Sequence, residues 1–451
     1  MKSANLFLDY PELMNSAIRR LSDTLKPSPG QHGFAPGYDL PEADEMVRVF
    51  ADAAKATWRD AGEYKGCQVS LLDLTGNPGC NTEKTLAAIL MVARAIEHIR
   101  RTGEPLIIFS PTSANKGTAL RDAVLRAISA GLAQPEELRI VTLVPKASLA
   151  KLRESELSVN PRLRALNPVF IYSGPDPEGV KALGRKFADQ YENQIYSAKK
   201  IRFWYSLEYR NYVIADTLRA FFEHAIAPVE DDDRPRLHAH AVSSAYGLLG
   251  YHSGRELLED AGLADVRRRP RSLLVQHLST PYMVLHLLNR DFARTGVPRY
   301  TFDPDTGLYR REGDIPNFPQ FCYQPDEQID PTFYTHCPPT SPAMTELIDR
   351  YGGTGIVVSL PECVRRYPQL RVRLTEAGYP LPADFRSLRE WSTVMGFTGA
   401  LNAIDRGLIA NGTHVVVTGS GTYSTNDFTS LNPRDAEYVD TIEDIADVLL
   451  A

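Results

Sequence analysis

The chain has 451 residues, of which 43% are hydrophobic, and its 50 basic and 56 acidic side chains give a net charge of −6. This length exceeds what one ordinary hydrophobic core accommodates, so we expect a globular protein with two or three lobes. Charges of both signs are mixed along the chain and form no basic stripe. This argues against a nucleic-acid partner and favours a small-molecule substrate.

The cysteines and the N-terminal residues indicate the cell compartment. The five cysteines are odd in number and far apart, without a CxxC pair, which predicts reduced thiols and no metal site. The first residues, MKSANLFLDYPELMNS, lack the continuous apolar segment of a signal peptide, and nowhere do 18 apolar residues run together. We therefore expect a cytoplasmic protein that does not enter a membrane.

The lysines are unevenly distributed. Only 12 of the 50 basic residues are lysines, and all of them lie at or before Lys200. Chemistry that needs an amine must therefore use the first half of the chain.

The predicted elements begin with about a hundred residues that look mostly helical and contain a polar Pro/Gly stretch at 26–41. The segment QVSLLDL (68–74) then predicts a buried strand, followed by a loop. A helix is expected from about Thr85, because apolar residues recur at positions 86, 89, 90 and 93.

This strand, loop and helix pattern is repeated along the chain. Further strands are predicted at PLIIFS (105–110), LRIVTLVP (138–145), PVFIYSG (168–174), LHAHAVSS (237–244), SLLVQHLS (272–279), GIVVSL (355–360) and THVVVTGSG (413–421). Helices are expected from Ser148 and Pro177, among others. Such alternation predicts an α/β fold with parallel sheets flanked by helices, in which ligands bind at the carboxyl ends of the strands.

Two segments interrupt the alternation. Residues 300–344, with seven prolines between Pro316 and Pro342, predict a long surface excursion or a cover over the active site. The acidic run Glu230–Asp233 favours a solvated turn over a metal site, since adjacent aspartates in a turn do not converge on one ion.

Three loops at predicted strand ends carry chemically useful side chains: GNPGCNTEK (76–84), PTSANKG (111–117) and VTGSGTYS (417–424). Their order resembles the fold type II, or tryptophan synthase β-like, family of pyridoxal-phosphate enzymes, and in particular threonine synthases and cysteine-synthase-like members. In that family a loop N-P-T-G-S-F-K supplies the Schiff-base lysine, a later strand ends in S/T-S-G-N-T-G, and a strand near the C-terminus ends in T-G-x-G.

The resemblance implies the domain organisation and the assembly. Residues 1–104 and 201–451 would form a large domain that binds pyridoxal phosphate, and residues 105–200 a small mobile domain. A homodimer is expected. The segments LVPKASLAKL (143–152), FWYSLEYRNYVIADTLRAFFE (203–223) and HAVSSAYGLLGYHSGREL (240–257) are similar to the family's intervening segments.

The resemblance also assigns the residues that would hold the cofactor. Lys84 would form the internal aldimine, Asn115 would bond the phenolate oxygen, and Thr418 would bond the pyridine nitrogen. The phosphate loop would be the segment Ser243, Ser244, Ala245, Tyr246 and Gly247.

The substrate carboxylate would lie against the asparagine loop, which comprises Thr112, Ser113, Ala114, Asn115 and Lys116. Glu390 and Ser392 resemble the family's segment at the substrate entrance.

Simpler roles are open for the same residues. Lys84 suits a surface lysine in the first turn of a helix, Asn115 an N-cap, and residues 243–247 a plain turn between strand and helix. Lys116 is a rival for the Schiff-base role. His238 and His240 share one face of a strand and suit packing better than contact with a cofactor.

The chain also departs from the family pattern. The lysine loop is one residue longer, with Thr82 and Glu83 in place of Ser-Phe, Ala114 replaces a glycine, and the phosphate loop has fewer glycines. The resemblance implies a lyase or transferase that performs β- or γ-elimination or replacement on an amino acid, as threonine synthase does. The departures leave open a cofactor-free binding or regulatory protein, and GSGTYS a nicotinamide-dependent dehydrogenase.

Overall fold

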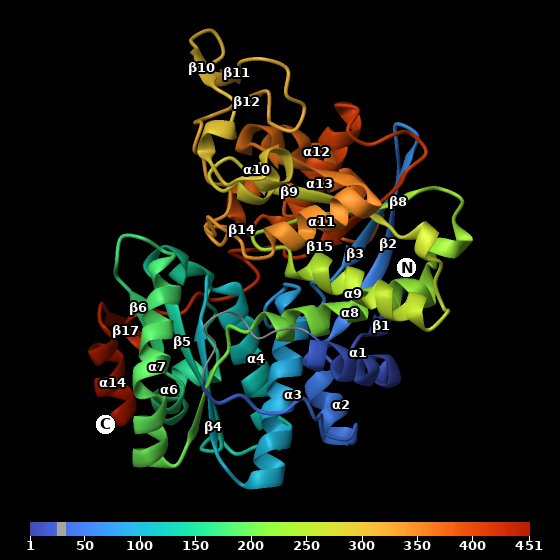
Figure 1. The fold of residues 1–451 in the computed structure, drawn as a ribbon. Helices are drawn as coiled ribbons and strands as arrows, with labels where there is room; N and C mark the ends of the chain where they lie inside the picture. Colours follow the sequence, from blue (N-terminus) through green and yellow to red (C-terminus); the bar gives the residue numbers. More distant parts are fainter. Residues whose placement is uncertain (25–32) are drawn as a thin grey trace. The chain divides into compact units, whose positions relative to one another are not determined.

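The computed structural model describes residues 1–24 and 33–451, which divide into two compact units (Figure 1). Unit 1 comprises Met1–Ala4, Lys55–Gly76 and Asp216–Asp427, and unit 2 comprises Asn5–Ala54, Asn77–Ala215 and Phe428–Ala451. Both units are therefore assembled from separate stretches of the chain. The ranges of the units differ from the predicted domains, because residues 5–54, 77–104 and 428–451 cluster with the segment 105–200. Which segments move together stays a prediction.

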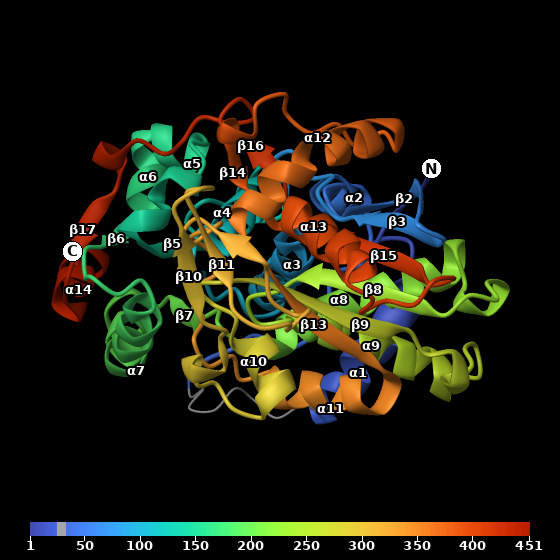
Figure 2. The ribbon, with the colours of Figure 1, turned by 90° about the horizontal axis from the view of Figure 1, so that it is seen from above.

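The core of unit 1 is a seven-stranded sheet with the order β1-β2-β3-β15-β8-β9-β13. These strands are β1 Lys2–Asn5, β2 Lys55–Tyr64, β3 Cys67–Asp73, β15 His414–Gly419, β8 Arg236–Ala241, β9 Arg271–His277 and β13 Gly353–Val358. From β3 to β13 all neighbours are parallel, whereas β2 pairs antiparallel with β3. Figure 2 shows β15, from near the end of the chain, lying with β3 and β8.

Helices cover both faces of this sheet. They are α8 Tyr209–Ile226, which begins in unit 2, and α9 Tyr246–Asp260, α10 Tyr282–Asn289, α11 Ser341–Tyr351, α12 Leu360–Glu376 and α13 Ser392–Asp405. In β9, Leu273 and Val275 join the core with α12 and α13, while Leu274 joins the core with α10 and α11. Burial on both faces explains why these strands read as continuous apolar runs.

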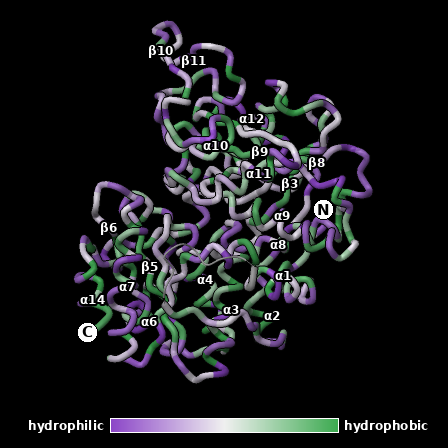
Figure 3. Tube along the Cα trace, viewed as in Figure 1, coloured by the Kyte–Doolittle hydropathy of each residue, from purple (hydrophilic) through white to green (hydrophobic). Residues whose placement is uncertain are grey.

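Unit 2 contains a five-stranded parallel sheet with the order β17-β6-β5-β4-β7. Its strands are β4 Leu106–Pro111, β5 Leu138–Pro145, β6 Val169–Tyr172, β7 Arg202–Tyr205 and β17 Glu437–Val439. Its helices are α1 Pro11–Thr24, α2 Glu45–Ala51, α3 Lys84–Thr102, α4 Asn115–Ser129, α5 Glu156–Val159, α6 Pro161–Leu166, α7 Gly179–Lys199 and α14 Ile442–Leu450. Hydrophobic residues follow most of α3 (Figure 3), in agreement with its thirteen buried positions.

The predicted α/β fold with parallel sheets and flanking helices is confirmed. The repeated strands lie where the apolar runs predicted them. The first hundred residues are less helical than expected, because the ten-residue strand β2 has too few strongly apolar residues to stand out. The helix expected from Ser148 is instead a 3-10 turn at Lys146–Lys151. The polar stretch 26–41 lies partly outside the described residues.

The proline-rich segment 300–344 is mostly irregular, as predicted. It also holds a small antiparallel sheet of β10 Tyr300–Asp303, β11 Leu308–Arg311 and β12 Phe321–Cys322. Shorter elements elsewhere are the strands β14 Leu388–Glu390 and β16 Tyr423–Ser424 and the 3-10 turns Val229–Asp231, Val266–Arg268, Arg294–Gly296, Phe385–Ser387 and Pro433–Asp435.

No helix within residues 1–24 or 33–451 combines the length and the apolar character that a bilayer crossing requires. All five cysteines are free thiols, and only Cys337 is exposed. In the same described ranges, no group of three or more His, Cys, Asp or Glu side chains could hold a metal ion.

Candidate active site

Three consecutive strands of the unit 1 sheet end at the same edge, and each leads into a loop that the sequence singled out. Thr418 of β15 lies opposite Leu72 of β3, and Val417 lies opposite Ala239 of β8. The pairing continues past the strand end, since the Leu74 amide donates to the Gly419 carbonyl at 3.1 Å. The chain leading to Lys84, the loop that holds Thr418 and the loop 243–247 therefore start side by side.

The loop that leads to Lys84 is fixed by the buried side chain of Asn77. Its Nδ2 donates to Asp122 Oδ2 of α4 at 2.8 Å and to Thr85 Oγ1 at 3.1 Å. Its Oδ1 accepts from the Gly79 amide at 2.9 Å and from Arg126 at 3.1 Å. One carboxamide thus bonds the loop to two helices and fixes the position of the residues that precede Lys84.

Lys84 itself is the first residue of α3, one position earlier than the predicted helix start. Its side chain is 32% exposed, and its Nζ lies 2.7 Å from Oε1 of the buried Glu83. Lys84 is therefore a half-buried, ion-paired amine and not a fully solvated surface lysine.

The asparagine loop has a strained backbone. Ala114 has φ +102°, in the region that favours glycine, and it is the N-cap residue of α4. Thr112 Oγ1 accepts from the amides of Ala114 at 3.1 Å and Gly117 at 3.0 Å. Asn115 is the first helical residue, so the simpler interpretation of Asn115 as the N-cap is wrong. Thr112 shapes the loop and retains one O–H to donate.

Lys116, in the first turn of α4, lies in an unusual environment. Its side chain is only 9% exposed, and its Nζ has no hydrogen-bond partner among the described residues. Burial, together with the positive charges of Lys181 and Lys84, lowers the pKa of Lys116 well below that of an ordinary lysine. Two other amines of unit 2 therefore act on Lys116, which is the most buried of the three.

The predicted phosphate loop forms a tight turn that leads into the N-terminus of α9. Ala245 takes the left-handed conformation, with φ +50°, and caps α9. A Cβ added at Gly247 would lie 2.5 Å from a guanidinium nitrogen of Arg219, so only glycine admits this approach. Arg219 is 2% exposed and pairs with Asp216 at 2.7 Å. A buried arginine of α8, which the sequence analysis did not single out, therefore lies beside the predicted loop.

The proline-rich segment contacts this loop. Ser243 Oγ donates to Thr335 Oγ1 at 3.3 Å, and the hydroxyl of Thr340 donates to the carbonyl of Ser244. Both threonines are buried. Within unit 1, residues of the segment 335–340 thus contact the predicted phosphate loop, and a role of this segment as a cover stays a prediction.

The loop after β15 is closely packed around its glycines. A Cβ at Gly419 would lie 2.8 Å from Leu71 Cδ1, and a Cβ at Gly421 would lie 2.7 Å from Cγ of Glu390. Thr418 is 1% exposed, and the buried hydroxyl of Ser420 has no partner among the described residues. Glu390 accepts from the amide and the hydroxyl of Ser392. The two segments that the resemblance assigned to the ring and to the substrate entrance therefore lie together.

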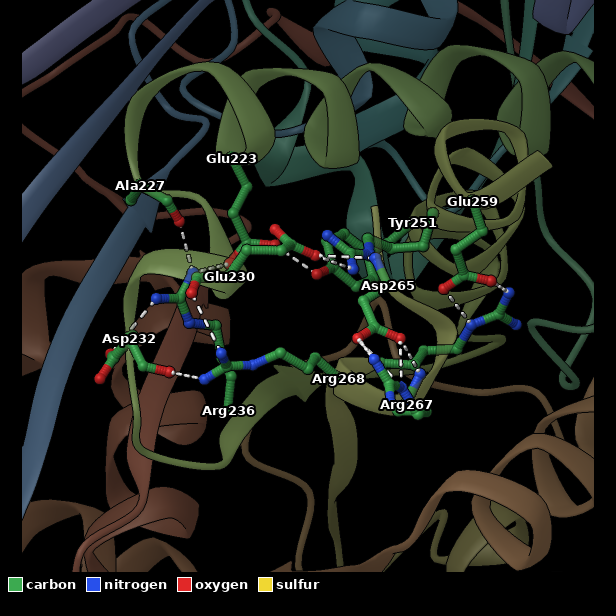
Figure 4. A network of polar contacts seen from close by, with 12 residues as sticks. Glu223, Ala227, Glu230, Asp232, Arg236, Tyr251, Glu259, Asp265, Arg267 and Arg268 are labelled. Carbon is green, nitrogen blue, oxygen red and sulfur yellow. Dashed lines mark hydrogen bonds and ion pairs between the residues drawn. The ribbon is translucent and has the colours of Figure 1, made fainter. Parts of the chain in front are cut away.

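The acidic run Glu230–Asp233 lies in a turn, as predicted, and Asp231 and Asp233 are exposed to solvent, but Glu230 and Asp232 are partly buried and ion-paired. Asp232 contacts Arg236 at 3.4 Å (Figure 4). Glu230 accepts from Arg255 at 2.9 Å, and Asp232 accepts from His414 Nδ1 at 2.7 Å. The pairs with Arg255 and His414 were not predicted, because these two partners lie far from the run in the sequence.

Beside this run, the fully buried Glu223 of α8 contacts Arg236, His238 and Tyr251. Burial alone would raise the pKa of Glu223, but the charges of His238 and Arg236 and the hydrogen bonds lower it overall. His238 therefore belongs to a packed polar network, the structural role that was favoured for it.

The predicted site residues divide between the two units. Unit 1 holds Thr418 and the loop Ser243, Ser244, Ala245, Tyr246 and Gly247, and unit 2 holds Lys84 and the loop Thr112, Ser113, Ala114, Asn115 and Lys116. Within each unit the sequence-distant members converge, since the loops of unit 1 leave adjacent strands and the charge of Lys84 acts on Lys116.

Comparison with solved structures finds proteins that share this fold. The chain is similar to the pyridoxal-phosphate-bound threonine synthase from Brucella melitensis, with 12% identity, a TM-score of 0.57, and coverage of 98% of this chain and 89% of that one. It is also similar to threonine synthase from yeast, with 10% identity, a TM-score of 0.55, and coverage of 99% and 89%. At such identities the likeness establishes a shared fold, which confirms the fold predicted from the resemblance.

Sequence comparison adds a family match. The model described as "Family of unknown function (DUF6002)" matches residues 2–451. A search of curated proteins finds no sequence that matches this chain.

Proposed function

Because the chain belongs to the DUF6002 family, whose description states no activity, we propose its function from the fold and the loops. The protein is a pyridoxal-phosphate-dependent lyase or transferase that acts on an amino acid by β- or γ-elimination or replacement. The observation that carries this proposal is the adjacency of β3, β15 and β8, whose loops lead to an amine, a hydroxyl and a turn at a helix N-terminus on a threonine-synthase-like fold.

The residues present fit the cofactor. A phosphate needs backbone amides at a helix N-terminus and a nearby cation, and Ala245, Gly247 and Arg219 offer both. The ring nitrogen needs a donor, which Thr418 would supply. The aldehyde needs an amine, and Lys84 follows the strand end that adjoins Thr418. When bound, pyridoxal phosphate supplies an electron sink for the electrons released at the substrate Cα.

Each protein group then has a defined task. The Lys84 amine would hold the aldehyde carbon of the cofactor and would move the proton at the substrate Cα. Glu83, 2.7 Å away, orients that amine and accepts a hydrogen bond from its charged form. Asn115 orients the ring by a hydrogen bond to the phenolate oxygen, and the O–H of Thr112 donates to the substrate carboxylate.

Thr418 bears on the reaction type. A neutral hydroxyl leaves the ring nitrogen largely unprotonated, unlike a carboxylate partner, so the electron sink is a mild one. A mild sink favours elimination or replacement over transamination. A homodimer in the cytoplasm and a mobile small domain are further parts of this proposal, and closure of that domain would exclude water from the substrate.

The test is trapping of the amine. Purified protein incubated with pyridoxal phosphate is expected to absorb at roughly 410–430 nm, as an imine between the aldehyde and a lysine does. Borohydride reduction and peptide mapping then locate a pyridoxyl group on Lys84. Lys84→Ala abolishes the absorbance, whereas Lys146→Ala, at an exposed lysine of the same unit, leaves it unchanged.

Other outcomes of this experiment have distinct meanings. A pyridoxyl group on Lys116 would transfer the amine role to that residue. No absorbance and no trapped group would contradict the proposal and favour a cofactor-free binding protein. Protection of residues 419–424 by NAD(H) would favour a dehydrogenase instead.

A further inference from the structure

The Lys116 amine is buried and has no acidic partner among the described residues. Its Nζ has no hydrogen-bond partner among the described residues, and its side chain is 9% exposed. Buried polar groups in native proteins are almost always paired with protein, water or ligand. An amine left alone at this depth therefore indicates a partner that residues 1–24 and 33–451 do not supply.

The surrounding charges identify the kind of partner. The charges that act on Lys116 are those of Lys84, at the start of α3, and Lys181, on α7. Both have acidic partners of their own, since Lys84 pairs with Glu83 at 2.7 Å and Lys181 pairs with Glu178 at 3.4 Å. Lys116 shares neither carboxylate. A cationic ligand would be repelled here, whereas an anion would be attracted.

The backbone supports the same conclusion. Lys116 stands in the first turn of the fifteen-residue helix α4, whose N-terminal amides favour a negative charge. The close packing of Gly117 on Thr112 and Thr142, where a Cβ would lie 2.7 Å and 2.9 Å from methyl carbons, keeps this turn against β4 and β5. The amine and the helix terminus therefore belong to one rigid part of unit 2.

We propose that Lys116 binds a carboxylate of the ligand and is charged only while that carboxylate is present, so that binding takes up a proton. In the empty site burial and the two neighbouring lysines favour the neutral amine. A bound carboxylate contributes a negative charge beside the nitrogen, which reverses the balance and draws one proton from solvent. The inference rests on the proposed function only in taking this carboxylate to be that of the substrate.

One consequence follows for the pH dependence of binding. Because a proton is taken up together with the anion, affinity falls as the pH rises above the pKa of the empty site. A lysine that was already charged in the empty site would give no such dependence. A neutral threonine, which the family pattern has at this position, would give no such pH dependence either.

Calorimetry of the full chain with glycolate, a simple carboxylate, tests the proposal. At a single pH, we expect the heat of binding measured in Tris to differ from that measured in bis-Tris. The difference should correspond to the transfer of about one proton from the buffer to the protein. Lys116→Met should abolish the uptake and weaken binding at least tenfold. Lys116→Arg should bind without uptake, because its guanidinium is charged in both states. Lys186→Met, at an exposed lysine of α7, should behave as the unaltered protein.

A second measurement avoids dependence on the stability of variants. In protein labelled with ¹³C-lysine, the side-chain resonance of Lys116, assigned with Lys116→Arg, should titrate well below the other lysines. Glycolate should shift that titration to higher pH. A Lys116 resonance that titrates with the exposed lysines overturns the proposal, as does binding of glycolate without proton uptake or no binding at all.

Two comparisons separate this proposal from its alternatives. Inorganic phosphate serves as a second probe, and uptake driven by phosphate but not by glycolate would overturn the assignment to a carboxylate. Trapping of pyridoxal phosphate on Lys84 without proton uptake at Lys116 would contradict only this inference. Proton uptake with no trapped cofactor would contradict only the proposed function.

Discussion

The guanidinium of Arg219 lies against the backbone of Gly247 so closely that a Cβ at position 247 would be 2.5 Å from one of its nitrogens. The two residues come from α8 and the first turn of α9. Together they combine a fixed cation with the amides of a helix N-terminus, the two groups that bind phosphate in proteins.

Gly247→Ala is therefore expected to displace Arg219 and to weaken binding of pyridoxal phosphate by about tenfold, or about 1.4 kcal/mol. Spectrophotometric titration with pyridoxal phosphate and with pyridoxal, which lacks the phosphate, checks the cause, because only the former should lose affinity. Glu256→Ala, at an exposed position of the same helix, is the control. An equal loss of affinity for both compounds would show that the turn does not bind the phosphate.

Ala114→Gly should stabilise the protein by up to about 1 kcal/mol, because glycine adopts φ +102° without the strain of a Cβ. Ala130→Gly, at the other end of α4 with φ −80°, should instead destabilise it by about 0.5–1 kcal/mol. Denaturant unfolding of both variants measures the difference. The strain explanation fails if the two substitutions change stability in the same direction.

Asn77→Ala should lower the free energy of unfolding by about 2–4 kcal/mol, because it removes the hydrogen bonds of a buried carboxamide to Asp122, Thr85, Arg126 and the Gly79 amide. The same variant should loosen the loop that leads to Lys84 and reduce trapping of pyridoxal phosphate. Asn193→Ala, at an exposed position of α7, should change neither quantity. Hydrogen exchange of the amides in 77–84 reports the loosening directly.

Stability should fall as the medium becomes acidic, in part because of His252. Burial, aided by the nearby charges of His238 and Arg269, lowers the pKa of His252 to about 3. In the unfolded chain this histidine takes a proton below about pH 6.5, so stability is full above that value and declines as the pH falls toward 3. At pH 5 the loss is about 2 kcal/mol.

His252→Gln should flatten this decline between pH 7 and pH 5, because glutamine can keep the hydrogen bond to Ser272, now 2.8 Å from Nε2, without titrating. His336→Gln, at an exposed histidine, should leave the decline unchanged. Denaturation midpoints at several pH values decide the matter. An unaltered slope in His252→Gln would place the acid sensitivity elsewhere.

The sequence predicts most of the fold because strands buried on both faces leave continuous apolar runs, as β4, β5 and β15 do. It does not predict β2, whose polar and small residues resemble those of a helix. The grouping of residues 5–54 with the unit 2 sheet was also missed, since that grouping depends on tertiary contacts.

The candidate site is predictable only in part, for a similar reason. The loops could be found from residue types at strand ends, and Lys116 could be identified as a rival amine. Its lack of a partner could not, because that depends on which side chains surround it. Arg219 was missed because an arginine within the amphipathic segment 203–223 carries no signal of its own. Only the approach of α9 gives it a role.

The position of β15 has a consequence for how the chain acquires its structure. This strand is formed by residues 414–419, yet it separates β3 from β8 in the middle of the unit 1 sheet. During synthesis, β3 and β8 emerge long before the strand that joins them and expose unpaired edges in the meantime. The sheet of unit 1 therefore forms late and cooperatively, and the three loops that leave its edge are brought together only in that final step.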